Sequence, residues 1–329
     1  MKIHRSVQRF AFATAICSTV VASAASAAEL RGWNIHVEDY PVSIGMESFA
    51  EDLAEKTGGE ITAKVYHNAV LGDQPDAIEQ LRLGVIDFGE FNLGPMGQAV
   101  PEANVTSLPF IFSSVPEMYE LMDGAVGEAI GEGMKAKGII PLGWYGAGAR
   151  SFYNSIQPIN TPADVEGMKV RVMSNDLFVK MVEAMDGNAT PMAFGEVYQS
   201  IKTGVVDGAE NNPPSYESTN HYEVAQYYSL TEHLIIPECL CMSLKTWEKL
   251  TPEQQEITMQ AGRDSALLQR ELWAEREAAS LEKVEAGGTT VNTVEDKAAF
   301  QDAMTPVYEA FLADNPDLTD LVNMIRSAE

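Results

Sequence analysis

The chain has few cysteines and, beyond its first 28 residues, no apolar run long enough to cross a membrane. Of three cysteines, Cys17 lies in the N-terminal apolar stretch, so only Cys239 and Cys241 follow it. They stand two positions apart on an expected strand, a spacing that we interpret as poor for a mutual disulfide. We therefore expect two buried or half-buried thiols, without a disulfide scaffold or a Cys/His zinc site.

Basic residues are also scarce. The sequence contains 22 Lys and Arg against 48 Asp and Glu, which gives a formal net charge of −26 at pH 7. Nucleic-acid binding needs a basic surface, so this composition argues against a nucleic-acid partner. The same acidity repels anions at long range, and an anionic ligand would therefore need local positive charge.

Signature motifs of several enzyme classes are missing. The sequence contains no Gly-x-Ser-x-Gly, no P-loop, no His-Glu-x-x-His and no Gly-x-Gly-x-x-Gly after an expected strand. These absences lower the odds of an enzyme without excluding one. We expect no catalytic residues, no cofactor and no metal.

The first 28 residues have the composition of a cleavable signal peptide. Three basic residues occur in the first nine positions, residues 10–21 are mostly apolar, and residues 22–28 are small. An uncleaved membrane anchor is the alternative. We expect export to the periplasm, with a mature protein that begins near Ala28 or Glu29 and is not embedded in the membrane.

A twelve-residue pattern occurs twice, at 81–92 and at 201–212. Each copy reads as a helix end stopped by Gly, a short β-branched strand, and polar residues at the strand's carboxyl end. Ligands of open α/β sheets bind at the carboxyl ends of strands. Two such units predict two similar lobes around a shared cleft; a chance likeness between two common joints is the alternative.

The expected elements alternate between strands and helices, which is the rhythm of an α/β fold with a mostly parallel sheet. We expect strands at 33–37, 61–66, 139–145, 168–173 and 290–293. We expect helices at 42–57, 73–83, 116–137 and from 252 to about 284, and an apolar run at 235–244 that crosses back toward the first lobe.

Two arginines occupy positions that favour anion binding. Arg150 follows the end of an expected strand, and Arg171 lies inside an apolar, alternating one. A buried guanidinium is costly without a partner, and it can bind a carboxylate through two parallel hydrogen bonds. A structural salt bridge is the alternative for each.

Further candidates stand at the ends of expected strands or beside them. Asn can donate and accept hydrogen bonds, and Glu accepts from hydroxyl groups. Helix capping, turn formation or core packing is the alternative for each of these side chains. The candidates are His36, Glu90, Asn92, Glu210, Asn211, Tyr216 and His233.

The combination of several segments resembles one family, the DctP-type periplasmic solute receptors of tripartite ATP-independent (TRAP) transporters. The segments that carry the resemblance are residues 107–112, 150–154, 161–171, 196–198, 203–212 and 231–233. It implies two α/β lobes, crossing hinge strands and a long helix that spans both lobes. We assign residues 29–148 and 237–276 to lobe I, 149–236 and 277–304 to lobe II, and 305–329 to a C-terminal helical segment.

The resemblance also implies a function. Arg171, assisted by Arg150 and Asn211, would hold the carboxylate of a small organic acid, which the receptor delivers to one small and one large membrane subunit. The sugar-acid receptors, including those for hexuronates, are the most similar subgroup, although they often carry Arg where this chain has Glu90. A hexuronate or an aldonate is the expected ligand. A sensory receptor and a periplasmic enzyme acting on sugar acids are the alternatives.

Overall fold

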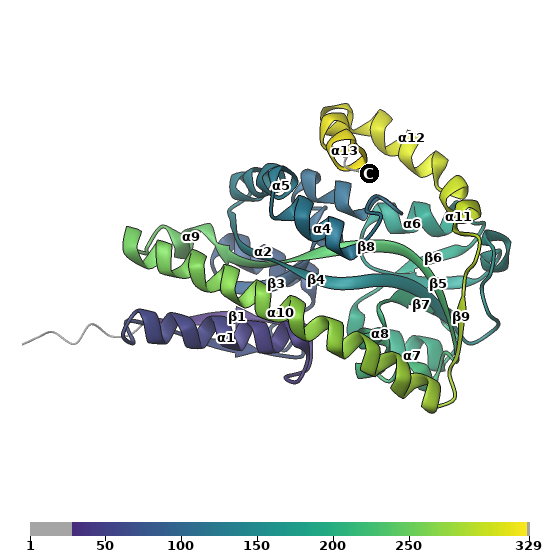
Figure 1. Ribbon diagram of the computed structural model, residues 1–329, viewed down its shortest axis with the longest axis horizontal. Coiled ribbons are helices and arrows are strands. Elements are labelled where there is room, and N and C mark those ends of the chain that lie inside the picture. The colour runs from purple at the N-terminus through teal and green to yellow at the C-terminus, as the bar shows by residue number, and fades with distance from the viewer. Residues whose placement is uncertain (1–27, 328–329) are drawn as a thin grey trace, which may run out of the picture.

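The computed structural model describes residues 28–327 (Figure 1). The expected signal peptide lies outside these residues, except for Ala28, which begins the first strand. Within the described range, no helix combines the length and the apolar character that a membrane crossing requires.

One continuous sheet of nine described strands organises the chain. The order is β2-β1-β3-β8-β4-β7-β5-β6, and β9 pairs with β8. The strands are β1 (Ala28–Trp33), β2 (Ile61–Tyr66), β3 (Phe88–Asn92), β4 (Ile139–Asn154), β5 (Lys169–Val172), β6 (Asn188–Pro191), β7 (Gly208–Asn211), β8 (Tyr227–Ser243) and β9 (Thr290–Thr293). Parallel strands β1–β3 form one lobe and parallel strands β5–β7 form the other. The predicted two-lobed α/β fold is confirmed.

The long antiparallel strands β4 and β8 run through both lobes (Figure 1). Toward the first lobe β8 pairs with β3, and toward the second lobe β4 pairs with β7. The register between β4 and β8 shifts between Gly146 and Ala149, where Gly148 has a φ of 61°. The expected lobe boundary lies at this irregularity, and the exact boundaries remain a prediction.

Helices cover both faces of the sheet. They are α1 (Pro41–Lys56), α2 (Gln74–Leu83), α3 (Leu93–Met96), α4 (Val115–Met122), α5 (Ala125–Ala136), α6 (Asp176–Glu183), α7 (Val197–Lys202), α8 (Pro213–Ser218), α9 (Leu244–Trp247), α10 (Pro252–Ala286), α11 (Lys297–Ala303), α12 (Thr305–Asp314) and α13 (Thr319–Arg326). Helix α10 starts at a capping box formed by Thr251 and Gln254. It crosses the molecule from α1 to α8, as Figure 1 shows, which is the expected lobe-spanning helix.

The repeated pattern forms two equivalent joints. Gly84 and Gly204 end α2 and α7 with φ angles of 70° and 73°, a backbone conformation that glycine adopts readily. The carboxylates of Asp87 and Asp207 each accept a hydrogen bond of 2.8 Å from the backbone of the neighbouring parallel strand. The repeat is therefore structural, and it sets β3 and β7 in matching positions.

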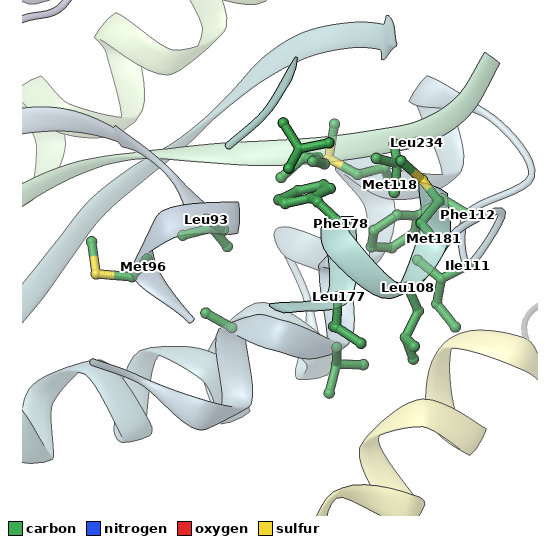
Figure 2. Packing of buried hydrophobic residues seen from close by; sticks show 14 of the residues in the cluster. Leu93, Met96, Leu108, Ile111, Phe112, Met118, Leu177, Phe178, Met181 and Leu234 are labelled. Carbon is green, nitrogen blue, oxygen red and sulfur yellow. The ribbon is translucent and has the colours of Figure 1, made fainter. Parts of the chain in front are cut away.

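The larger apolar core lies on one side of the sheet and joins the two lobes. Figure 2 shows Phe178 and Met181 of α6, in the second lobe, directed toward Phe112, Met118 and Leu234. This packing gives the lobes a common apolar contact beside the strands that connect them. Burial of such large side chains contributes about 1.5–3 kcal/mol each.

The structure differs from several expectations. The strand expected at 139–145 continues to Asn154, so Arg150 lies inside β4 and does not follow its end. The helix expected at 116–137 is two helices, α4 and α5, because the chain turns at Asp123 and Gly124 between them. The first strand spans Ala28–Trp33 and not 33–37.

A further difference concerns the cysteines, which are joined by a disulfide. The expectation of two free thiols is wrong, because Cys239 and Cys241 are alternate residues on one face of β8, and their Cα atoms lie 5.4 Å apart, within the usual disulfide range.

Candidate functional site: a polar cleft between the lobes

A cleft lies where β3, β8 and β4 meet β5 and β7. Its empty space is about 600 Å³, including its open mouth. Six of the residues selected from the sequence line it: His36, Glu90, Asn92, Arg150, Arg171 and Asn211. The structure thus brings together side chains from both copies of the repeated pattern and both arginines.

Arg171 presents unused hydrogen-bond donors to the cleft. Its Nε and one terminal nitrogen both donate to the carbonyl oxygen of Met192, at 3.0 and 2.8 Å. A guanidinium has five N–H groups, so three remain after these two bonds. No carboxylate of the described residues forms an ion pair with Arg171, and burial lowers the pKa of its side chain to about 10. A carboxylate ligand would supply the missing negative charge.

Arg150 is already paired with the protein's own carboxylate. Its Nε donates to Glu210 at 2.6 Å, one terminal nitrogen donates to a Glu210 carboxylate oxygen and to the Glu210 carbonyl, and the other donates to Asn211 at 2.6 Å. Four of its five N–H groups are therefore used. Burial opposes the charge of Arg150, and the Glu210 carboxylate outweighs it and raises the Arg150 pKa. The structural-salt-bridge alternative holds for Arg150, which keeps one donor for a ligand.

The first-lobe wall carries two buried carboxyl groups, from Glu90 on β3 and Glu238 on β8. The Asn92 side chain donates to Glu238 Oε1 at 3.2 Å. Burial, together with the neighbouring Glu238 carboxylate, holds the pKa of Glu90 well above its usual range, and burial also raises the Glu238 pKa. The cleft is therefore cationic on its second-lobe wall and weakly charged on its first-lobe wall.

His36 and Asn92 are held in place by neighbouring groups. The His36 ring stacks on Tyr40 at 3.9 Å between ring centres. Burial, with a smaller effect of the Arg150 charge, lowers the His36 pKa to about 3, so the imidazole is neutral at pH 7. Asn92 also caps α3 through the backbone N–H of Gly94, so both the capping and the cleft position hold for this residue.

Three selected residues lie outside the cleft wall. Glu210 is fully buried under Arg150. Tyr216 packs in the core of the second lobe, and its hydroxyl donates to the Ala225 carbonyl at 2.6 Å. The His233 ring stacks on Phe152, and its Nε2 lies 3.8 Å from the Glu210 carboxylate.

Six polar residues of the cleft are not among the candidates selected from the sequence: Asp73, Gln74, Ser174, Asn212, Ser215 and Glu238. Glu238 carried a signal, since it is a lone acid inside an apolar run, where an unpaired charge is costly. Asn212 occupies in the second repeat the position of Asn92 in the first, and it caps α8 as Asn92 caps α3.

Hydrogen bonds cross between the lobes around the cleft. The Tyr40 hydroxyl and the Ser215 hydroxyl lie 2.9 Å apart. Gln98 donates to the Ser174 carbonyl at 2.8 Å, and Asn175 donates to the Gly94 carbonyl at 2.6 Å. The lobes are thus closed over a space lined by charged and polar groups. Within residues 28–327, no group of three or more His, Cys, Asp or Glu side chains could hold a metal ion.

Comparisons with known proteins agree with this geometry. Residues 34–315 match the family model described as bacterial extracellular solute-binding protein, family 7 (DctP). A curated solute-binding protein of Chromohalobacter salexigens is 54% identical over 329 residues, which covers 100% of this chain and 98% of that protein.

Two solved structures of TRAP periplasmic solute-binding proteins are also similar. One, from Sulfitobacter sp. NAS-14.1 with bound β-D-galacturonate, is 71% identical, with a TM-score of 0.90 and coverage of 91% of this chain and 100% of that chain. The other, from Roseobacter denitrificans with bound β-D-glucuronate, is 60% identical, with a TM-score of 0.90 and coverage of 91% and 99%. The chain belongs to the DctP family of TRAP solute-binding proteins, which are receptors and not enzymes.

Proposed function

We propose that this protein is a periplasmic receptor for a hexuronate, D-galacturonate or D-glucuronate, and that Arg171 is the principal anchor of the ligand carboxylate. The observation that carries the proposal is the set of three unused N–H donors on a buried arginine beside the cleft. The uronates bound to the two similar structures support the choice of ligand class.

The donors left on the two arginines set the expected pose. Two N–H groups on neighbouring nitrogens of Arg171 can bind both oxygens of one carboxylate. Arg150 and Asn211 would add one hydrogen bond each from the same wall. The sugar hydroxyls would then reach His36, Glu90 and Asn92 on the opposite wall, where acceptor and donor groups alternate.

Binding from both walls would favour the closed lobes. A ligand that contacts Arg171 in the second lobe and Asn92 in the first stabilises only the conformation that brings these groups together. The hydrogen bonds that Gln98 and Asn175 donate across the lobes would form in the same closed conformation. We take the hinge to lie near Gly148, at the expected boundary between residues 29–148 and 149–236.

Delivery would follow the family pattern. Residues 1–28 would direct export and be cleaved, and the closed receptor would pass its ligand to one small and one large permease subunit in the inner membrane. Uptake of labelled galacturonate by vesicles that contain both subunits should require this protein; uptake without it would refute the transport role.

Isothermal titration calorimetry with D-galacturonate and D-glucuronate tests the binding itself. We expect dissociation constants near micromolar, or roughly 8 kcal/mol. Arg171→Ala should lose binding, while Arg82→Ala, on the surface of α2, should not. An Arg171→Ala protein that binds as tightly as the parent would refute the proposed anchor.

A further inference from the structure

Two buried carboxyl groups stand together on the first-lobe wall of the cleft. Glu90 lies opposite Leu240, and Asn92 lies opposite Glu238, in the antiparallel ladder between β3 and β8. Residues at alternate positions share a face, so Glu90 and Glu238 are diagonal neighbours on the same face. They are only 1% and 5% exposed.

These carboxyl groups have unsatisfied oxygens that no helix cap or ion pair explains. Among residues 28–327, both oxygens of Glu90 and Oε2 of Glu238 have no hydrogen-bond donor other than a proton held between the two carboxyl groups. Both residues line the cleft. Buried polar atoms are normally hydrogen-bonded, so the oxygens that the shared proton leaves free require donors that can only come from the cleft.

The surrounding groups do not neutralise two negative charges. Asn92 contributes one amide donor to Glu238. The charged group that acts on Glu238 is Arg150, whose guanidinium is bonded to Glu210 and Asn211. Two phenols interact electrostatically with both acids: Tyr40, which is hydrogen-bonded to Ser215, and Tyr145, which is hydrogen-bonded to Ser265. Tyr119, beside Arg270, interacts with Glu238.

Two carboxylates so close in a buried site cannot both ionise easily, because each charge raises the cost of the other. The raised pKa of Glu90 agrees with this argument, and Glu238, which accepts from Asn92, is the better holder of the negative charge. The neutral His36 adds no compensating positive charge.

We propose that Glu90 and Glu238 share one proton and form a subsite for the hydroxyl groups of the sugar acid, and that this subsite excludes ligands with a second carboxylate. The inference deepens the proposed function and rests on it. The shared proton joins Glu90 to Glu238, and the remaining carboxyl oxygens of the pair accept from hydroxyl hydrogens of the ligand. A second carboxylate would meet the negative charge of Glu238 without a cation.

The test compares D-galacturonate with galactarate, which carries a carboxylate at both ends of the same carbon chain. For the unmodified protein, calorimetry at pH 7 should give galactarate a dissociation constant at least about 100-fold higher than that of D-galacturonate. The ratio of these two dissociation constants is the quantity compared between variants. Glu238→Gln removes the charge and should reduce this ratio at least about tenfold. Glu90→Gln leaves the Glu238 charge in place, so the ratio of the galactarate to the galacturonate dissociation constant should stay within about threefold of that of the unmodified protein.

Glu102→Gln is the matched control. Glu102 has a buried carboxylate oxygen without a described partner and lies outside the cleft, so the ratio should not change in this variant. Thermal unfolding of each variant checks that it folds. The ratio of dissociation constants for the unmodified protein tests the proposal even if a variant does not fold.

The outcomes separate the two proposals. Two results would overturn the acid-pair subsite and leave the receptor function intact. In one, galactarate and galacturonate bind the unmodified protein with equal affinity; in the other, Glu238→Gln leaves the ratio of their dissociation constants unchanged. Failure of the unmodified protein to bind either D-galacturonate or D-glucuronate refutes the proposed function and the subsite with it.

Discussion

The two arginines of the cleft should respond to removal in opposite ways. Arg150→Ala leaves the Glu210 carboxylate, which is fully buried, beside a neutral His233 with no cation. Breaking a buried ion pair by removing one partner costs about 3–5 kcal/mol of folding free energy. We therefore expect a large loss of stability, of about 10 °C in the unfolding midpoint.

Arg171→Ala should behave differently, because its described partner is the Met192 carbonyl and not a carboxylate. Its removal takes away a buried charge without leaving an unpaired one. The loss should fall on binding, at about 2–5 kcal/mol, which corresponds to a dissociation constant increased about 30-fold to several thousand-fold.

Urea unfolding and calorimetry with D-galacturonate measure the two effects separately. A double variant, Arg150→Met with Glu210→Met, removes both charges and should regain much of the stability that Arg150→Ala loses, since an apolar pair can replace a buried ion pair. A stable Arg150→Ala protein, or an Arg171→Ala protein that unfolds easily yet binds normally, would contradict this division of roles.

Three further predictions follow from the described contacts. The pKa of Glu90 is raised in the folded state, so above pH 4.5 the native protein holds a proton that the unfolded chain has lost. The free energy of unfolding therefore falls as pH rises from 4.5 to the folded pKa, by up to about 1.4 kcal/mol per pH unit. Glu90→Gln should reduce this pH dependence, measured by urea unfolding at pH 5 and pH 8. Gly148→Ala should destabilise by about 1–3 kcal/mol in the same assay, because φ is 61° and a Cβ would collide with Glu277. Asp87→Ala and Asp207→Ala should each cost about 1–3 kcal/mol, and a negligible effect of either would contradict the equivalence of the two joints.

Local patterns predicted the elements that position the cleft. The Gly that ends each repeated helix lies where the sequence indicated, because a left-handed Gly depends on few neighbours. The strand that follows was displaced: it begins after the β-branched pair, at Phe88 and Gly208, and contains the polar residues that the sequence placed beyond its end. The start of α10 was equally readable, since its capping box and Pro252 are local signals.

Local sequence patterns did not predict the contacts between segments that are distant in the sequence or the exact spacing within a strand. Tyr216 reads as a cleft aromatic, yet its hydroxyl turns to Ala225 and its ring to the core, which only the packing of α8 decides. The Cys239–Cys241 disulfide depends on how closely β8 brings two Cα atoms together, a quantity that spacing alone does not give. Glu238 joins the cleft because β8 returns beside β3.

The repeated pattern also explains why the cleft has a direction. Glu90 and Glu210 occupy the same position in the two copies, but their neighbours differ. Glu210 forms a buried ion pair with Arg150, while Glu90 lies beside another acid, Glu238, and lines the cleft. With Glu210 committed to Arg150, Arg171 is left as the cation without a carboxylate partner, on the second-lobe wall. A carboxylate should therefore enter toward the second lobe and hydroxyl groups toward the first, because the different neighbours of one duplicated glutamate give the two walls different electrostatic character.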